Sequence, residues 1–238
     1  MNTLSRLHKR IAEKANDPSA APVLIVAFGD SVTQGMTAYG EQTHDEVYHA
    51  RLKWMLESWY PQCTFSVINA GVSGQSATGA LALLERDVIR HQPDLVLISF
   101  GLNDAWGGLE KVGAFADALT QSVTRIQNET KSEVILLTPS FMNKADNPRV
   151  HLVHRHLISG MAEIQNSGTL AAYAEAVRQV AQQLAVPCAD VYRAWEALAE
   201  QGVDTDAMLA NGLNHPTAEA HEIAAEALIR IVIGEQAR

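Results

Sequence analysis

Cysteine is scarce in this chain. Cys63 and Cys188 are the only two among 238 residues, which excludes a disulfide framework or a zinc site built from several thiolates. Basic residues are also outnumbered: 18 lysines and arginines stand against 27 aspartates and glutamates, for a net charge of −9. A chain of this charge repels phosphate backbones and anionic lipid headgroups. We therefore expect neither nucleic acid nor a membrane among its partners.

Long hydrophobic runs are absent as well. The longest strongly apolar segments, such as Val23–Phe28, are far shorter than the roughly 20 residues that span a bilayer. Residues 1–21 contain basic residues but lack the continuous apolar middle region of a secretory signal, and they predict an amphipathic helix followed by a linker. We therefore expect a cytoplasmic protein with two free thiols, unless a leader has been removed.

The pattern of residues 22–238 predicts one α/β domain, with two smaller domains as the less economical alternative. Short runs rich in Val, Ile, Leu and Phe alternate with longer segments whose apolar residues recur at steps of three and four, which is typical of helices covering a parallel sheet. The predicted strands are Val23–Phe28, Phe65–Asn69, Leu95–Phe100, Val134–Thr138 and Val186–Val191. The predicted helices are Asp45–Trp59, Ala77–His91, Val112–Thr130, Thr169–Leu184 and Thr217–Ile233.

Residues 139–168 lack this periodicity. Long irregular connections in compact domains are often active-site lids, so we predict a lid or an insertion here. The segment contains His151, His154 and His156, and imidazole is a common zinc ligand. No cysteine or carboxylate nearby completes a recognisable ligand set, so we expect no metal and assign these histidines to substrate contact or to solvation.

Polar residues follow the predicted strands and precede the last predicted helix. The segments are Gly29–Val32, Asn69–Gly74, Gly101–Asp104 and Asn214–Pro216. Ligands bind just beyond the carboxyl ends of the strands in open parallel sheets. These segments are therefore expected to assemble one site.

The residue types in these segments suit acyl transfer. Ser31 is a nucleophile that needs a base, and His215 supplies one. The oxyanion that forms needs fixed donors, which the backbone N–H groups of Ser31 and Gly71 and the side-chain amide of Asn103 can provide. Taken singly, Ser31 and Asn103 could instead be helix caps and Gly71 a turn glycine. Their joint occurrence favours a serine hydrolase.

These blocks resemble the GDSL, or SGNH, hydrolase family. The first block reads Phe28-Gly29-Asp30-Ser31-Val32-Thr33-Gln34-Gly35, and the third, Gly101-Leu102-Asn103-Asp104, is similar to the family's G-x-N-D. The resemblance implies a three-layer α/β/α, flavodoxin-like fold with a five-stranded parallel sheet in the order 2-1-3-4-5, and hydrolysis of esters or thioesters without a metal or other cofactor. On such a fold Cys63 and Cys188 lie at opposite edges of the sheet, about 19 Å apart, beyond disulfide reach.

The sequence departs from the family pattern next to His215. The family has an aspartate three residues before the histidine, which orients the imidazole and stabilises its charged form, whereas this chain has Gly212. Two alternatives follow. In the first, Ser31 and His215 form a dyad whose imidazole is oriented by a carbonyl group or by an amide, for which Asn211 and Asn214 are the nearest candidates. In the second, Asp206 folds in from upstream. We favour the dyad.

The expected function is hydrolysis of carboxylic esters with short acyl groups, for example O-acetyl esters of carbohydrates. Trp106 and the polar segment 139–168 favour a polar alcohol portion. Trp106 is a candidate substrate contact, and Asp30 is a candidate brace of the site or substrate contact.

There are two alternative functions. One is a thioesterase or lysophospholipase, which needs an apolar acyl tunnel, and the other is a carbohydrate-binding protein that has lost turnover. An α/β-hydrolase fits poorly, because Gly35 lies four residues after Ser31 rather than two. The sequence leaves a homo-oligomer open.

Overall fold

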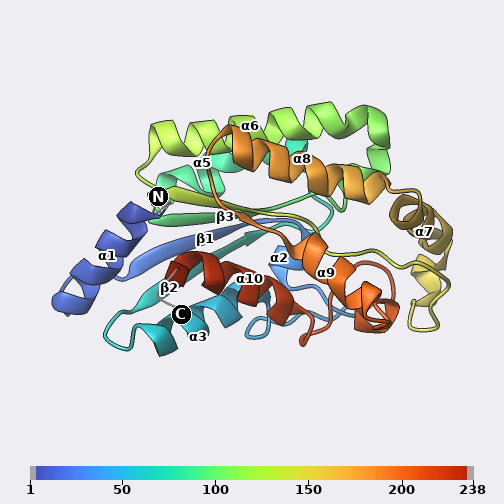
Figure 1. Ribbon diagram of the computed structural model, residues 1–238, viewed down its shortest axis with the longest axis horizontal. Helices are drawn as coiled ribbons and strands as arrows, with labels where there is room; N and C mark the ends of the chain where they lie inside the picture. Colours follow the sequence, from blue (N-terminus) through green and yellow to red (C-terminus); the bar gives the residue numbers. More distant parts are fainter. Residues whose placement is uncertain (1–3, 235–238) are drawn as a thin grey trace.

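The computed structural model describes residues 4–234 and is built around a parallel β-sheet (Figure 1). The strand order is β2-β1-β3-β4-β5, with every neighbouring pair parallel. This confirms the predicted fold class and strand order. The strands are β1 (Val23–Gly29), β2 (Phe65–Gly71), β3 (Leu95–Ser99), β4 (Glu133–Leu137) and β5 (Cys188–Ala189).

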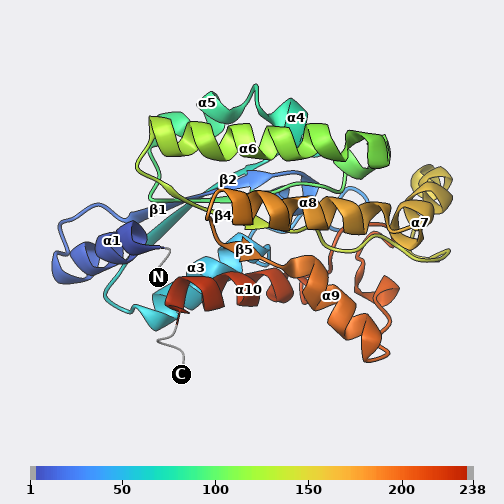
Figure 2. The ribbon, with the colours of Figure 1, turned by 45° about the horizontal axis from the view of Figure 1, so that its top comes forward.

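Helices cover both faces of the sheet (Figure 2). The helices α4, α5, α6 and α8 lie over one face, and α3 and α10 lie over the other, so the central strands are buried on both sides. The helices are α1 (Ser5–Asn16), α2 (Ser31–Gln34), α3 (Tyr48–Trp59), α4 (Ala77–Ala80), α5 (Leu84–Asp87), α6 (Val112–Glu129), α7 (Ile158–Asn166), α8 (Thr169–Gln183), α9 (Val191–Glu200) and α10 (His221–Ile233).

The predicted amphipathic helix near the N-terminus is α1. It buries Leu7 and Ile11, and the Leu7 N–H donates to the Glu133 carboxylate at 2.8 Å. Because Glu133 opens β4, α1 lies at the amino-terminal ends of the strands, at the end of the sheet opposite the carboxyl-terminal loops. No helix within residues 4–234 is both long and apolar enough to cross a membrane. Cys63 and Cys188 are both free thiols.

Two predicted helices begin later than expected, at Tyr48 in place of Asp45 and at His221 in place of Thr217, and three predicted elements differ more. The predicted helix Ala77–His91 is split into α4, α5 and a final 3₁₀ turn. The predicted strand Val186–Val191 is reduced to two residues, because the Asp190 side chain accepts from the Arg193 N–H and caps the start of α9. Residues 139–168, expected to be irregular, contain a 3₁₀ segment and α7.

Residues 139–168 are fastened to the rest of the protein at several points. The Asn143 N–H donates to the Leu213 carbonyl oxygen at 2.6 Å, which joins the segment to the loop before His215. The Asp206 carboxylate accepts from the Lys144 N–H at 2.9 Å. Asp206 therefore holds this segment in place, and the role of the segment as a lid stays a prediction.

Candidate active site

The register of the sheet brings three of the predicted site segments together at the carboxyl-terminal ends of β1, β2 and β3. Gly29 at the end of β1 lies between Gly71 of β2 and Ser99 of β3. A Cβ atom on Gly29 would lie 2.6 Å from the Ser99 carbonyl oxygen and would collide with Thr33. Only glycine therefore lets the chain turn from β1 into α2 with the strand and helix this close.

Ser31 is the first residue of α2, which is capped by Asp30. The Asp30 Oδ1 accepts from the Val32 N–H at 2.9 Å, the usual contact of an N-cap side chain. Ser31 is thus not the cap of this helix, and its hydroxyl is available for another partner. That partner is His215: the Ser31 Oγ lies 3.0 Å from the His215 Nε2.

The second ring nitrogen of His215 faces a backbone carbonyl group. The His215 Nδ1 lies 3.0 Å from the Thr37 carbonyl oxygen, which can only accept, so Nδ1 carries the proton and Nε2 is free to accept one. Burial lowers the pKa of His215, and the charge of nearby His154 lowers it further, although the Thr37 hydrogen bond acts in the opposite direction. The imidazole is therefore neutral near pH 7, as a general base requires.

The Thr37 carbonyl is held by its own loop. The Thr37 N–H donates to the Glu41 carbonyl oxygen at 3.1 Å, and the Thr43 N–H donates to the Gly35 carbonyl oxygen at 2.8 Å. Of the orienting groups considered from the sequence, the carbonyl is the one that the structure places at the imidazole.

Asn211 and Asp206, the predicted orienting residues, act on the backbone instead of on the ring. The Asn211 Oδ1 accepts from the N–H groups of Leu213, Asn214 and His215 at 2.9, 3.0 and 3.0 Å. Asn211 therefore sets the shape of the loop that presents the base. Asp206 accepts from the backbone of residues 144 and 145.

Position 212 has no room for a larger side chain. Gly212 has a φ of +71°, and a Cβ atom there would lie 2.9 Å from the Val150 Cγ2 and 3.0 Å from the Asn147 Cγ. Residues 147 and 150 belong to segment 139–168. This segment therefore occupies the space beside position 212, where the family pattern has its aspartate.

The predicted oxyanion donors of the second and third segments lie next to neighbours of Ser31, with Asn103 beside Asp30 and Gly71 beside Gln34, but they differ in availability. The Gly71 N–H donates to the Asn69 Oδ1 at 3.0 Å. The Asn103 Nδ2 donates to the Gln75 carbonyl oxygen at 3.1 Å and lies 3.4 Å from the Asp30 Oδ2. The 3.4 Å contact is long for a hydrogen bond, so the second amide hydrogen of Asn103 is weakly held.

A further glycine, missed in the sequence, directly precedes Gln75, whose carbonyl oxygen accepts from the Asn103 amide. Gly74 is in a turn closed by the Gln75 N–H donating to the Val72 carbonyl oxygen at 3.1 Å, and its φ of +75° favours glycine. Within residues 4–234 the Gly74 N–H has no hydrogen-bond acceptor. The signal in the sequence was the second glycine of Asn69–Gly74, which could be read only as a turn residue.

Asp30, the residue before Ser31, is only 2% exposed. Burial, with a smaller contribution from the charge of Asp104, raises the pKa of Asp30 to about 7. Burial likewise raises the pKa of Asp104 to about 6. With its oxygens directed at Val32 and Asn103, Asp30 is placed as a brace of the site rather than at its surface.

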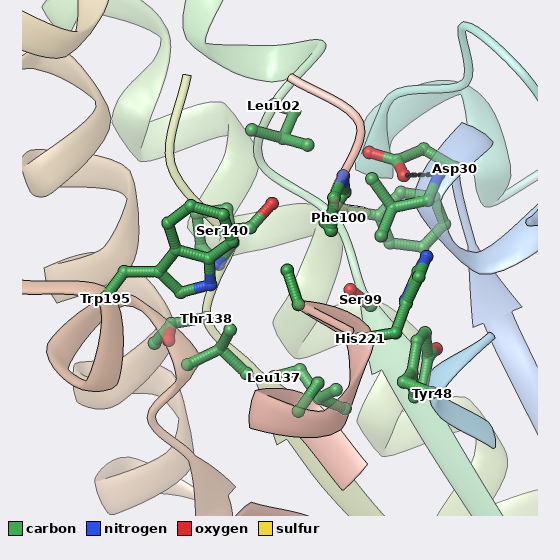
Figure 3. Close-up of a pocket in the computed structure, with 16 residues that line it drawn as sticks. Asp30, Tyr48, Ser99, Phe100, Leu102, Leu137, Thr138, Ser140, Trp195 and His221 are labelled. Carbon is green, nitrogen blue, oxygen red and sulfur yellow. Dashed lines mark hydrogen bonds between the residues drawn. The ribbon is translucent and has the colours of Figure 1, made fainter. Parts of the chain in front are cut away.

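Asp30 also borders a small internal cavity of about 20 Å³ (Figure 3). Val32 and Pro216, the neighbours of Ser31 and His215, line the cavity together with mainly apolar side chains such as Phe100, Leu102 and Trp195. The volume is close to that of one water molecule.

Trp106 and the three histidines lie in the segments around the site. Trp106 is 45% exposed, and its six-membered ring packs against Gly160 of α7. His151 stacks on Tyr39, with ring centroids 4.0 Å apart, and His154 meets the same ring edge-on at 5.2 Å. His156 is exposed. In the part of the chain that the structure describes, no group of three or more His, Cys, Asp or Glu side chains could hold a metal ion.

Comparison with known proteins identifies the family of this chain. A sequence model of the GDSL-like lipase/acylhydrolase family matches residues 27–223. The chain belongs to this family. The match spans β1 to α10 and so includes both Ser31 and His215. The predicted family and the predicted enzyme class, a carboxylic ester hydrolase, are confirmed.

The individual relatives share low sequence identity with this chain. An acetylxylan esterase from Geobacillus stearothermophilus is 26% identical over 219 residues, which cover 87% of this chain and 92% of that protein. A crystal structure of an acetylxylan esterase from the same organism superposes with a TM-score of 0.69 at 23% identity, over 92% of this chain and 98% of the other. A lipase/acylhydrolase from Enterococcus faecalis superposes with a TM-score of 0.66 at 25% identity, over 89% and 95% of the two chains.

Proposed function

We propose that this family member is a serine esterase that removes acetyl groups from carbohydrate esters, using Ser31 and His215 as a dyad. The observation that carries the proposal is the 3.0 Å contact between the Ser31 Oγ and the His215 Nε2. The imidazole that makes this contact is neutral and has its proton on Nδ1, so it can accept the hydroxyl proton at once.

The reaction proceeds in two halves. The Nε2 of His215 takes the proton of Ser31 as the Oγ attacks the ester carbonyl, and then delivers that proton to the departing alcohol, which leaves an acetyl-enzyme. Water, activated by the same nitrogen, releases acetate. The Thr37 carbonyl holds the ring throughout through its hydrogen bond to Nδ1.

The oxyanion is stabilised by donors that are fixed before the reaction starts. We assign this role to the Ser31 N–H, the Asn103 amide and a glycine N–H of the loop after β2. Gly71 was the glycine expected from the sequence. Gly74 is the stronger candidate, because the Gly71 N–H is engaged by the Asn69 side chain whereas the Gly74 N–H lacks an acceptor in residues 4–234. Donors of this kind contribute about 10²- to 10³-fold each to the rate.

A relative supports a small acyl group on a carbohydrate. The relative that is 26% identical is an acetylxylan esterase. This likeness favours acetyl esters over the thioesterase and lysophospholipase alternatives.

The test is a set of p-nitrophenyl esters of increasing acyl length, assayed beside acetylated xylo-oligosaccharides, each with and without a chelator. We expect acetate to be the best acyl group, the acetylated sugar to be hydrolysed, and the chelator to have no effect. A preference for long acyl chains, or loss of activity with the chelator, would contradict the proposal.

The role of the dyad is tested by labelling with a fluorophosphonate probe, which reacts only with an activated serine. Ser31→Ala is expected to abolish both labelling and turnover, whereas Ser58→Ala, at an exposed position on α3, retains both. A folded wild-type protein that is not labelled would favour a carbohydrate-binding protein without turnover.

A further inference from the structure

Three aromatic side chains meet beside the candidate base. Tyr39 stacks on His151 with an interplanar angle of 6°, and His154 approaches the same phenol ring at 77°. Tyr39 comes from the loop after α2, and the two histidines come from segment 139–168. We call Tyr39, His151 and His154 the Tyr39 cluster.

The Tyr39 cluster lies on the imidazole side of the site. Tyr39 is two residues from Thr37, whose carbonyl oxygen contacts the His215 ring. The charge of His154 is close enough to His215 to lower the pKa of that imidazole. The oxyanion donors, in contrast, come from α2 and from the loops after β2 and β3.

The position relative to the base determines which part of a substrate the cluster meets. A general base that has taken the serine proton must hand it to the oxygen of the leaving alcohol, so the alcohol portion of an ester lies against the imidazole. Groups that border His215 therefore contact the alcohol portion, whereas the oxyanion donors contact the carbonyl oxygen.

The cluster has the surface that a sugar ring requires. Tyr39 is 51% exposed although His151 covers one face of its ring. A pyranose ring presents C–H groups that pack on an aromatic ring. Its hydroxyls need hydrogen-bond partners such as the imidazole nitrogens. Tyr39 and His154 offer these two kinds of contact next to each other.

The cluster is also held in place before a ligand binds. The loop of Tyr39 is closed by the Thr37–Glu41 backbone hydrogen bond. The helical turn that carries His154 is joined to the preceding loop by an exposed ion pair, in which the Arg155 guanidinium contacts both oxygens of Asp146 at 3.0 Å. Side chains that are already in contact lose less conformational entropy on binding than free ones do.

We propose that Tyr39, supported by His151, is the platform on which the sugar of the alcohol portion stacks, and that His154 hydrogen-bonds its hydroxyls. The platform rests on the proposed function and makes Tyr39 a specificity-determining residue. It selects the alcohol portion and leaves the choice of acyl group to the other side of the site.

The test compares two acetate esters: an acetylated xylo-oligosaccharide, and ethyl acetate, whose alcohol portion is too small to reach a stacking platform. The quantity measured is the ratio of kcat/KM on the sugar ester to kcat/KM on ethyl acetate. Tyr39→Ala is expected to lower this ratio about three- to tenfold, the usual effect of one aromatic contact, and Tyr39→Phe to preserve most of it. Tyr39→Leu, which keeps apolar bulk without a ring, should resemble Tyr39→Ala and serves if the alanine variant fails to fold.

The control is Trp59→Ala, which removes an aromatic side chain that is 46% exposed at the far end of α3 and should leave the ratio at its wild-type value. Equal losses on both esters in Tyr39→Ala, or an unchanged ratio, would overturn the platform and leave the proposed function standing. A wild-type enzyme that hydrolyses ethyl acetate but not the sugar ester would instead overturn the proposed substrate and the platform together.

Discussion

His215 is oriented by the backbone of Thr37: its Nδ1 lies 3.0 Å from that carbonyl oxygen. A carbonyl group accepts a hydrogen bond from the Nδ1–H and fixes the tautomer as a carboxylate would, but it carries only a partial negative charge. It therefore stabilises the imidazolium less than an aspartate does. The dyad keeps the geometry of a triad while losing part of its electrostatic support.

This arrangement has a consequence for the pH dependence of the rate. Burial lowers the pKa of His215 below its ordinary value of 6.5, and the base works only when it is neutral. The acid limb of kcat/KM should therefore have its midpoint below 6.5, and activity should persist into mildly acidic solution. Hydrolysis of p-nitrophenyl acetate between about pH 4.5 and 8 measures this limb. A midpoint above 6.5 would indicate a carboxylate partner and contradict the carbonyl assignment.

Asn211 is expected to position the base through its three backbone hydrogen bonds. Asn211→Ala removes the acceptor for residues 213–215, so His215 shifts relative to Ser31 and kcat should fall about 10- to 100-fold. Asn211→Asp keeps the acceptor and should retain most of the activity. Its added negative charge should also move the acid limb to higher pH, because a nearby carboxylate favours the charged imidazole.

The matched control for Asn211 is Asn166→Ala, at an exposed position whose amide donates only to the Lys144 carbonyl oxygen. It should change neither kcat nor the pH profile. If Asn211→Ala affects only thermal stability and leaves kcat near the wild-type value, Asn211 does not position the base.

The sequence predicted best those features that depend on local periodicity. The predicted helix Val112–Thr130 differs from α6 by one residue at its end, because its buried positions recur at three- and four-residue steps over its whole length. The predicted strand Leu95–Phe100 similarly agrees with β3. The helix α7 was missed, because it is short and buries only Met161, Ile164 and Gln165.

Which particular backbone groups complete the site could not be predicted. Ser31 and His215 were found because hydroxyl and imidazole side chains have a recognisable chemistry. The Thr37 carbonyl has no such signal, since every residue carries one, and it meets a histidine 178 positions away. For the same reason the sequence could not show whether Gly71 or Gly74 has a free N–H. The answer depends on where the Asn69 side chain points and on how the turn at Gly74 folds, and residue types reveal neither.

Restoring the family aspartate is expected to fail in this protein. Gly212→Asp would place a Cβ atom 2.9 Å from the Val150 side chain at a φ of +71°, so we expect a loss of stability of about 1–3 kcal/mol and no gain in kcat. Gly212→Ala should lose nearly as much, because the collision begins at the Cβ. Thermal or urea unfolding gives the stability, and the p-nitrophenyl acetate assay gives kcat.

Gly202 provides the control for position 212. Its φ of +83° is similar, but a Cβ atom there would meet no atom within 4 Å. Gly202→Ala therefore measures the backbone strain alone, and the difference from Gly212→Ala measures the packing against segment 139–168. Equal losses at the two positions would mean that this segment does not fill the space beside Gly212.

Asp30 should make the stability of the fold depend on pH. In the folded protein its pKa is raised from 3.8 to about 7, so the folded state holds a proton that the unfolded chain releases near pH 4. This contribution to stability is complete below about pH 4 and is lost as the pH rises to about 7.

Asn at position 30 mimics the protonated acid, and its Oδ1 can still cap α2. The difference in Tm between Asp30→Asn and the wild type should therefore grow in favour of the variant from pH 5 to pH 8. The control is the exposed Asp17, whose pKa is lowered instead of raised, by its hydrogen bonds to Ser19. The Tm difference between Asp17→Asn and the wild type should not grow in favour of the variant from pH 5 to pH 8. A Tm difference at position 30 that is independent of pH would show that Asp30 ionises normally and does not bury its proton beside Asn103.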